Sequence, residues 1–138
     1  MKTLYTAEVT ATGGRSGHVT SSDGIIDMPV ALPEGLGGKG GSTNPEQLFA
    51  AGYASCFQSA LMVVASKQQV RLDPASTVKA TVTLNQQEDG AYGLGVSLDV
   101  DLKDIDKEQS RKLVEEAHRI CPYSVGTRGN IDVKLNVV

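Results

Sequence analysis

Two cysteines, Cys56 and Cys121, are the side chains of this sequence with the clearest capacity for covalent chemistry. A free cysteine is often only a small buried hydrophobe, but a thiolate is a nucleophile, and two thiols can cycle through a disulfide. A disulfide between them would close a loop of about 65 residues and would require Cα atoms within about 7 Å of each other. The residue types therefore leave two interpretations open for Cys56, a packing residue or a reactive thiol.

If Cys56 is reactive, a nearby charge must stabilise its thiolate. The residue falls about eleven positions into a predicted helix, roughly 16 Å from the first turn, where the helix dipole has little effect. Burial alone would raise the thiol pKa and make the side chain inert. A cation must then come from another element, and Arg15, between glycines in a predicted turn, is the best candidate by residue type. The alternative for Arg15 is an ordinary solvated turn residue.

Other kinds of site have weaker support. His18 and His118 are not spaced as zinc ligands usually are, so no metal site is predicted. We expect His118 to be solvated among the charges of a helix, and His18 to be an ordinary strand residue. The segment from Gly35 to Gly40 matches G-x-G-x-x-G, but it lacks a βαβ context. We interpret it as a flexible loop and not as a dinucleotide or phosphate site.

The element that carries Cys56 is a long predicted helix, from Asn44 to about Gln69. Pro45 suits its first position, Thr43 or Asn44 can cap it, and Thr43 with Glu46 fits a capping box. Apolar residues occur around its whole circumference, which predicts burial on every side. The apolar run is long enough to suggest a membrane span, but its polar side chains and the absence of basic flanks favour a buried helix of a soluble protein.

The other elements group into strands and helices without regular alternation. The predicted elements are strands at 4–11, 18–21 and 25–30, a hairpin of 78–84 with 92–102, a helix capped by Asp106 that stops or restarts at Pro122, and a strand at 131–137. This order predicts an α+β fold with one antiparallel sheet of about six strands. Such a sheet cannot cover a helix that is apolar all round, so we infer an obligate homodimer.

Composition narrows the class of protein. The 138 residues suffice for a single domain, 1–138, with a real core. A net charge of -3 and the lack of a basic run argue against nucleic acid as a partner. Met1-Lys2 leads straight into a strand pattern without a secretory signal, which predicts a cytoplasmic protein that is not bound to a membrane. In the cytoplasm, a cysteine pair is more often catalytic or redox-sensing than structural.

Several stretches closely resemble the organic hydroperoxide resistance proteins, the Ohr branch of the Ohr/OsmC family. These stretches are Ala11–Gly17, Asn44–Phe57, Cys121–Ser124 and Thr127–Asn130, in the order of the family. The likeness spans essentially the whole chain, and Val125-Gly126 is the one small departure. The resemblance implies an OsmC-like α+β fold, in which antiparallel sheets wrap around long central helices in an intertwined homodimer.

The same resemblance implies a thiol-dependent peroxidase that reduces organic hydroperoxides. By motif, Cys56 is the peroxidatic cysteine, Cys121 is the resolving cysteine, Arg15 activates the thiolate and Glu46 orients Arg15. No cofactor is expected to be bound, and the reductant implied is an external dihydrolipoyl dithiol on a lipoylated protein. The aromatic side chains Phe49, Tyr53 and Phe57 are candidates for an apolar substrate wall, with plain core packing as the alternative.

One expectation goes beyond the resemblance. Glu46 and Cys56 are ten positions apart on the predicted helix, which separates them by about 15 Å along its axis. One arginine could hardly bridge both, so we expect composite sites in which the partner subunit supplies Arg15 and Glu46. Two other functions stay open: a peroxidase of the OsmC branch, and a non-catalytic thiol redox sensor on the same fold.

Overall fold

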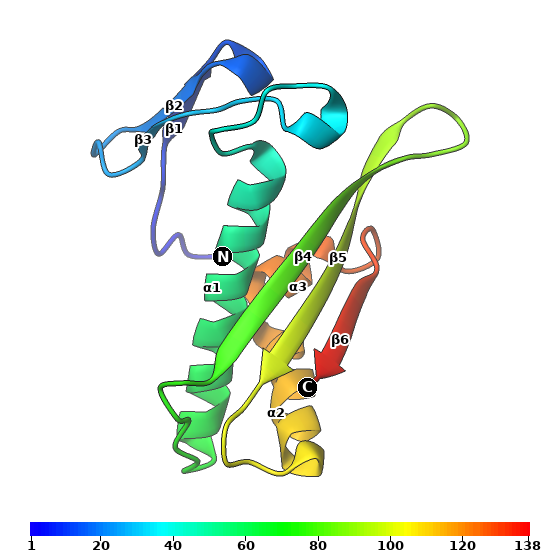
Figure 1. Cartoon of the computed structure of the whole chain (residues 1–138). Coiled ribbons are helices and arrows are strands. Elements are labelled where there is room, and N and C mark those ends of the chain that lie inside the picture. The colour runs from blue at the N-terminus through cyan, green and yellow to red at the C-terminus, as the bar shows by residue number, and fades with distance from the viewer. The chain divides into compact units, whose positions relative to one another are not determined.

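The computed structural model describes all of residues 1–138. The chain forms two compact units, an N-terminal unit of residues 1–48 and a C-terminal unit of residues 49–138 (Figure 1). Each unit contains its own three-stranded sheet, with strand orders β1-β2-β3 and β4-β5-β6. The expected α+β class is therefore correct, but the single sheet of about six strands is wrong, because strands of the two halves do not pair.

The N-terminal unit is an antiparallel sheet of short strands. Its strands are β1 (Val9–Thr12), β2 (His18–Ser21) and β3 (Asp27–Pro29). The predicted turn at Asp23-Gly24 is confirmed between β2 and β3, with Gly24 at φ 75°. The first strand begins at Val9 and not at Leu4, because its partner β2 is only four residues long and pairs no further than Val9 with Ser21.

Two short 3₁₀ turns complete this unit. Gly14–Ser16 (η1) connects β1 to β2, and Glu34–Leu36 (η2) lies in the glycine-rich loop that precedes the long helix. An isolated bridge between Val30 and Thr43 closes the base of that loop. The loop is therefore ordered by backbone hydrogen bonds of its own. One of them runs from the Gly38 N–H to the Pro33 carbonyl oxygen at 3.0 Å.

The sheet of the C-terminal unit is mixed, which corrects the expectation of purely antiparallel pairing. Strands β4 (Thr77–Gln86) and β5 (Tyr92–Asp101) form the predicted hairpin in antiparallel register. Strand β6 (Val133–Val137) pairs with β5 in parallel. The reason is the intervening crossover: helices α2 and α3 return the chain to the starting end of β5 and lie against one side of the sheet (Figure 1).

Helix α1 runs from Pro45 to Lys67 and starts as predicted. Asn44 is the residue that caps it, since its Oδ1 accepts a hydrogen bond from the Gln47 N–H at 2.9 Å. The alternative capping box of Thr43 with Glu46 is wrong: the Thr43 hydroxyl donates to the Gln47 side chain, and the Glu46 carboxylate binds an arginine.

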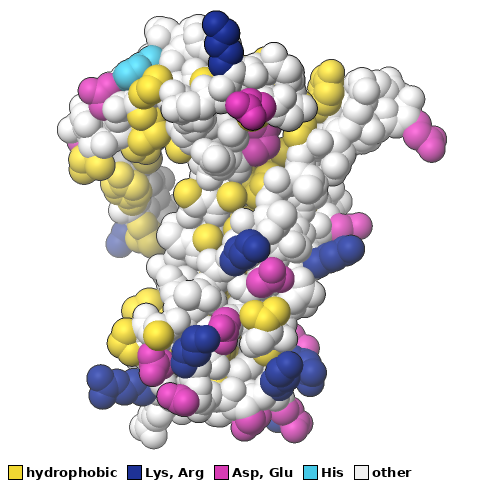
Figure 2. Space-filling model, viewed as in Figure 1, with side chains coloured by type: hydrophobic (Ala, Val, Ile, Leu, Met, Phe, Trp, Pro, Cys, Tyr) yellow, Lys and Arg dark blue, Asp and Glu magenta, His cyan; other side chains and the backbone are white.

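The prediction that α1 is buried on every side is also wrong for the single chain. One side joins the core of the C-terminal unit and is formed by Tyr53, Phe57, Ala60, Leu61, Val64 and Ala65. A second stripe at helical spacing stays exposed, and it consists of Ala51, Ser55, Ser59, Met62, Val63 and Ser66. Met62 is 60% exposed and Val63 is 47% exposed. Figure 2 shows hydrophobic side chains coming to the surface along this helix.

Length and composition would allow α1 to cross a membrane. The core helix of a soluble protein satisfies the same criteria, and α1 supplies six buried residues to the core of the C-terminal unit. We therefore interpret α1 as a core helix with one uncovered face.

Helices α2 (Lys107–Ile120) and α3 (Pro122–Thr127) confirm the sequence-based boundaries. Asp106 caps α2 by accepting a hydrogen bond from the Gln109 N–H at 2.8 Å. The helix ends at Ile120, and a new helix begins at Pro122, because proline disfavours helical geometry in the residue before it but suits the first position of a helix. Cys121 lies at this break.

Candidate functional site

The two cysteines that are far apart in the sequence meet in the C-terminal unit. Cys56 Sγ in the middle of α1 lies 3.7 Å from Cys121 Sγ, and both thiols are free. Cys121 is fully buried, whereas Cys56 is half-buried. A disulfide requires about 2.0 Å between the sulfur atoms, so a small movement of the side chains would suffice to form one.

Cys121 owes its position to the break between two helices. Its N–H closes α2 on the Ala117 carbonyl oxygen at 2.8 Å, and its carbonyl oxygen accepts the Val125 N–H of α3 at 2.9 Å. Between these bonds its backbone is extended, with φ -60° and ψ 125°. The residue therefore caps both helices, which points its sulfur at Cys56.

The surroundings of Cys56 within this unit do not favour the thiolate. Burial raises the pKa of the Cys56 thiol, and the neighbouring Cys121 raises it further, whereas a backbone hydrogen bond from Tyr123 lowers it. Sequence reasoning missed this donor. The Cys121-Pro122 pair carried the signal, because it starts α3 at Pro122, and the first N–H groups of a helix have no partner within it.

Tyr123 also packs against the turn of α1 that precedes Cys56. Its ring lies 5.9 Å from that of Phe49 and 5.4 Å from that of Tyr53, between centroids. Its hydroxyl lies so close to Gly52 that a Cβ at position 52 would stand 2.5 Å from the oxygen. Glycine at 52 therefore allows α3 to approach α1 at the cysteines.

The three aromatic residues predicted to form a substrate wall separate into two groups. Tyr53 and Phe57 are fully buried and belong to the core, as the alternative interpretation held. Phe49 is only partly buried, and Tyr123, which the sequence analysis did not select, is 37% exposed. Of these aromatic side chains, Phe49 and Tyr123 are therefore the ones that reach the surface of this unit.

Behind the cysteines lies a set of hydrogen-bonded polar side chains. Tyr53 Oη lies 2.8 Å from Ser124 Oγ, which lies 2.8 Å from His118 Nδ1. The expectation that His118 is solvated is wrong, because α3 folds back over it and leaves it half-buried. Burial lowers the pKa of His118, and the positive charge of Arg128 lowers it further.

The predicted cation lies in the N-terminal unit, where it binds the carboxylate that the family resemblance assigns to it. Arg15 Nη1 and Nη2 donate to Glu46 Oε2 and Oε1 at 2.8 and 2.6 Å. This two-pronged hydrogen bond lowers the pKa of Glu46 and raises that of Arg15. The Arg15 side chain is 37% exposed and that of Glu46 is 15% exposed, so the guanidinium remains accessible while the carboxylate holds its orientation.

Glycines shape the turn that presents Arg15. Gly13 has φ 75°, a left-handed conformation that suits glycine. At Gly17 a side chain has no room, since a Cβ there would collide with the Thr12 carbonyl oxygen and lie 2.7 Å from the Gly13 Cα. The turn from Gly13 to Gly17 is therefore a specific structure, and Arg15 is not an ordinary solvated turn residue.

No group of three or more His, Cys, Asp or Glu side chains is arranged to hold a metal ion. His18 forms an exposed pair with Asp27, with 2.5 Å between His18 Nε2 and Asp27 Oδ1. The G-x-G-x-x-G segment forms the loop around η2, with no strand–turn–helix arrangement.

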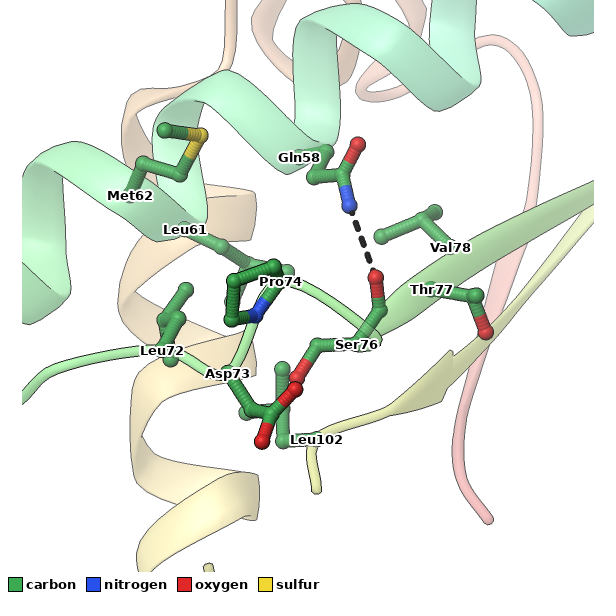
Figure 3. Close-up of a pocket in the computed structure, with 10 residues that line it drawn as sticks. All are labelled: Gln58, Leu61, Met62, Leu72, Asp73, Pro74, Ser76, Thr77, Val78 and Leu102. Carbon is green, nitrogen blue, oxygen red and sulfur yellow. Dashed lines mark hydrogen bonds between the residues drawn. The ribbon is translucent and has the colours of Figure 1, made fainter. Parts of the chain in front are cut away.

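A cavity of about 300 Å³ lies between α1 and the start of β4. Figure 3 shows that Gln58 and Met62 line it from the helix and that Gln58 Nε2 donates to the Ser76 carbonyl oxygen at 3.1 Å. Its other lining residues include Leu72, Pro74 and Val78. Neither cysteine lines this cavity, so it is separate from the thiol pair.

Comparison with known proteins identifies relatives over the full length of the chain. The family described as OsmC-like protein matches residues 38–136. The chain is 50% identical over 135 residues to the organic hydroperoxide resistance protein OhrB of Bacillus subtilis, covering 97% of this chain and 98% of that protein.

Solved structures of organic hydroperoxide resistance proteins also match this chain. The crystal structure of B. subtilis OhrB matches with a TM-score of 0.90 at 49% identity, covering 99% of this chain and 100% of that chain. A crystal structure from Legionella pneumophila, described as an organic hydroperoxide resistance protein OsmC, matches with a TM-score of 0.93 at 46% identity. It covers 99% of this chain and 98% of its own.

Proposed function

Because this chain belongs to the OsmC-like protein family and is 50% identical to a protein named for organic hydroperoxide resistance, we propose that it reduces organic hydroperoxides to alcohols with its cysteine pair. The observation that carries the proposal is the distance of 3.7 Å between Cys56 Sγ and Cys121 Sγ. A half-buried thiol beside a fully buried one suits a nucleophile that meets the substrate and a second thiol that is protected from it.

In the first step, the Cys56 thiolate attacks the terminal, hydrogen-bearing oxygen of R–O–O–H. An S–O bond forms, the O–O bond breaks, and the leaving alkoxide takes a proton to give the alcohol. Cys56 is then a sulfenic acid, oxidised by two electrons.

In the second step, the Cys121 sulfur attacks the Cys56 sulfur, the S–O bond breaks, and the sulfenic hydroxyl group leaves as water with the proton of the Cys121 thiol. The resulting disulfide protects Cys56 from further oxidation. An external dithiol then reduces it by thiol–disulfide exchange. We propose a dihydrolipoyl group of a lipoylated protein as this reductant and the cytoplasm as the compartment, with no cofactor bound to the chain itself.

We propose Arg15 as the group that activates Cys56 and Glu46 as the group that orients Arg15. The activation is needed because burial raises the Cys56 pKa. Each pKa unit by which a cation lowers it corresponds to about 1.4 kcal/mol in favour of the thiolate. The two-pronged bond between Arg15 and Glu46 supports the orienting role.

We further propose that the protein is a homodimer and that each site takes Arg15 and Glu46 from the partner subunit. The exposed face of α1 supports a second subunit, because Met62 and Val63 leave apolar surface uncovered. The cavity beside Met62 adds to this surface. Separation of Glu46 from Cys56 by ten positions along α1 supports the composite arrangement.

The substrate class follows from the aromatic residues beside Cys56. Phe49 and Tyr123 present apolar rings at the surface, which favours alkyl or lipid hydroperoxides over hydrogen peroxide. Tyr53 and Phe57 would support this wall from the core without contacting the substrate in the present conformation.

Turnover of cumene hydroperoxide with dihydrolipoamide tests the proposed function. We expect turnover by the wild-type protein, slower turnover of hydrogen peroxide, and complete loss in Cys56→Ser. The matched variant Cys121→Ser should still consume one equivalent of peroxide but should then stop. Activity that survives Cys56→Ser would refute the proposal, whereas disulfide formation without turnover by any dithiol would indicate a redox sensor.

A further inference from the structure

Three polar side chains form a continuous series of hydrogen bonds beside the cysteines, and the proposed chemistry uses none of them. Ser124 Oγ stands in the middle, 2.8 Å from Tyr53 Oη on one side and 2.8 Å from His118 Nδ1 on the other. Tyr53 and Ser124 are fully buried, and His118 is half-buried. We call these residues the polar triad.

The polar triad joins all three helices of the C-terminal unit. Tyr53 lies on α1, three positions before Cys56, and His118 lies on α2, three positions before Cys121. Ser124 lies in the first turn of α3, next to Tyr123. Cys56 lies on α1, and Cys121 lies between α2 and α3. Each cysteine is therefore within one helical turn of a member of the triad.

Counting donors and acceptors shows that Ser124 is the central member. With neutral His118, the Tyr53 hydroxyl donates to Ser124 Oγ, and the Ser124 hydroxyl donates to His118 Nδ1. The only other partner of Tyr53 Oη is Thr127 Oγ1 at 3.5 Å, a long contact. Loss of the Ser124 hydroxyl would therefore leave the buried phenol without a good partner.

A polar series in this position is not required for packing. Phenylalanine at 53 and alanine at 124 would fill nearly the same space without buried polar atoms. A buried polar network whose hydrogen bonds are all made instead imposes one relative position on the elements that it joins, because displacing them leaves polar groups unpaired.

We propose that the polar triad fixes α1, α2 and α3 relative to one another so that Cys121 remains ready to attack Cys56, with 3.7 Å between their sulfur atoms. Tyr53, Ser124 and His118 are positioning residues, since they act through Cys56, Cys121 and the backbone of α3. Their role in peroxide turnover rests on the proposed function, but their effect on the thiols can be measured without peroxide.

Oxidised glutathione provides the first measurement. Cys56 displaces one glutathione thiolate and forms a mixed disulfide, which Cys121 then resolves. In this second step the Cys121 thiolate attacks the Cys56 sulfur, the bond to glutathione breaks, and the second glutathione leaves as thiolate. Mass spectrometry of acid-quenched samples follows both species, and Cys121→Ser isolates the first step.

We expect Ser124→Ala to slow the resolving step about fivefold to tenfold, the kinetic equivalent of roughly one buried hydrogen bond. Tyr53→Phe should act in the same direction, and Ser124→Thr, which keeps a hydroxyl, should restore most of the rate. Ser110→Ala is the matched control, because Ser110 is a serine of α2 that is 2% exposed and lies outside the triad.

The second measurement is the pH profile of Cys56 alkylation by iodoacetamide in the Cys121→Ser background. The backbone of Tyr123 lowers the Cys56 pKa, so a displacement of α3 would weaken an interaction that favours the thiolate. Ser124→Ala should therefore move the profile to higher pH and lower the rate near neutral pH severalfold, whereas Ser110→Ala should leave it in place. If Ser124→Ala does not fold, Tyr53→Phe replaces it in both measurements.

These outcomes separate the two proposals. The positioning role would be overturned if the triad variants had the same resolving rates and pH profiles as Ser110→Ala, even with normal peroxide turnover. Altered resolution in a protein that reduces no hydroperoxide would uphold the positioning role and refute the proposed function.

Discussion

The two halves of the proposed catalytic machinery are built in opposite ways. The N-terminal unit presents an ion pair between Arg15, in the turn from β1 to β2, and Glu46, at the start of α1, and the arginine is partly exposed to solvent. The C-terminal unit presents two free thiols against an apolar core, with Cys121 fully buried. One region supplies charge without a nucleophile, and the other supplies a nucleophile whose pKa its own surroundings raise.

This difference shows that the thiols and the cation have opposite environments. Burial keeps Cys121 close to Cys56 and protects it, but burial also disfavours the thiolate. The Arg15 guanidinium is accessible and oriented, yet within its own unit it binds only a carboxylate. Under the proposed function, the cation and the thiol are each stabilised in their own environment before they act together.

Among the variants that test this comparison, we expect the largest effect on kcat/KM from removing the cation. Arg15→Ala should lower kcat/KM for cumene hydroperoxide about a hundredfold, as expected for the loss of one group that stabilises developing negative charge. Glu46→Gln should lower it less, because Arg15 keeps its charge and loses only its orientation. Steady-state kinetics with dihydrolipoamide measure both, and unchanged kcat/KM in Arg15→Ala would refute the activating role.

The pH dependence of Cys56 should show a smaller but more direct effect. The thiolate appears only as the pH rises through the Cys56 pKa, so the alkylation rate in Cys121→Ser increases with pH. Adding Arg15→Ala should move this increase to higher pH, since the remaining surroundings raise the Cys56 pKa. Iodoacetamide profiles with and without Arg15→Ala measure the contribution of the cation, and identical profiles would show that Arg15 does not act on Cys56.

The smallest expected effect concerns the turn that holds Arg15, and it is an effect on stability. Gly17→Ala places a Cβ against the Thr12 carbonyl oxygen and should cost about 1–3 kcal/mol of unfolding free energy. Gly35→Ala is the matched control in the same unit, since a Cβ there meets nothing within 4 Å. Chemical denaturation compares the two, and equal stability would contradict the proposed rigidity of the turn.

Local patterns predicted most elements of the fold. Asp106 capped α2 as expected, Pro122 restarted the helix, and the hairpin of β4 with β5 followed from alternation around a tight turn. These features depend on neighbours in the sequence, so residue types alone reveal them. The first strand was predicted too long because its length depends on the partner strand, which local alternation does not describe.

Long-range pairing could not be predicted in the same way. The parallel pairing of β6 with β5 depends on the path of the helical crossover, and the sequence pattern of β6 is compatible with either direction. The half-buried state of His118 and its bond to Ser124 arise because α3 folds back over α2. A helical wheel of α2 alone places the same histidine among charged residues.

For the candidate site, the sequence by itself selected two cysteines and an arginine in a glycine turn by residue type, and the family resemblance added a glutamate at the start of the long helix. Side-chain chemistry is a property of each residue, and glycine and proline set local geometry. Only the tertiary structure decided that the sulfur atoms of Cys56 and Cys121 lie 3.7 Å apart and that Ser124 lies 2.8 Å from both Tyr53 and His118. These distances depend on how α1, α2 and α3 pack, and packing is a sum of many contacts that no single motif encodes.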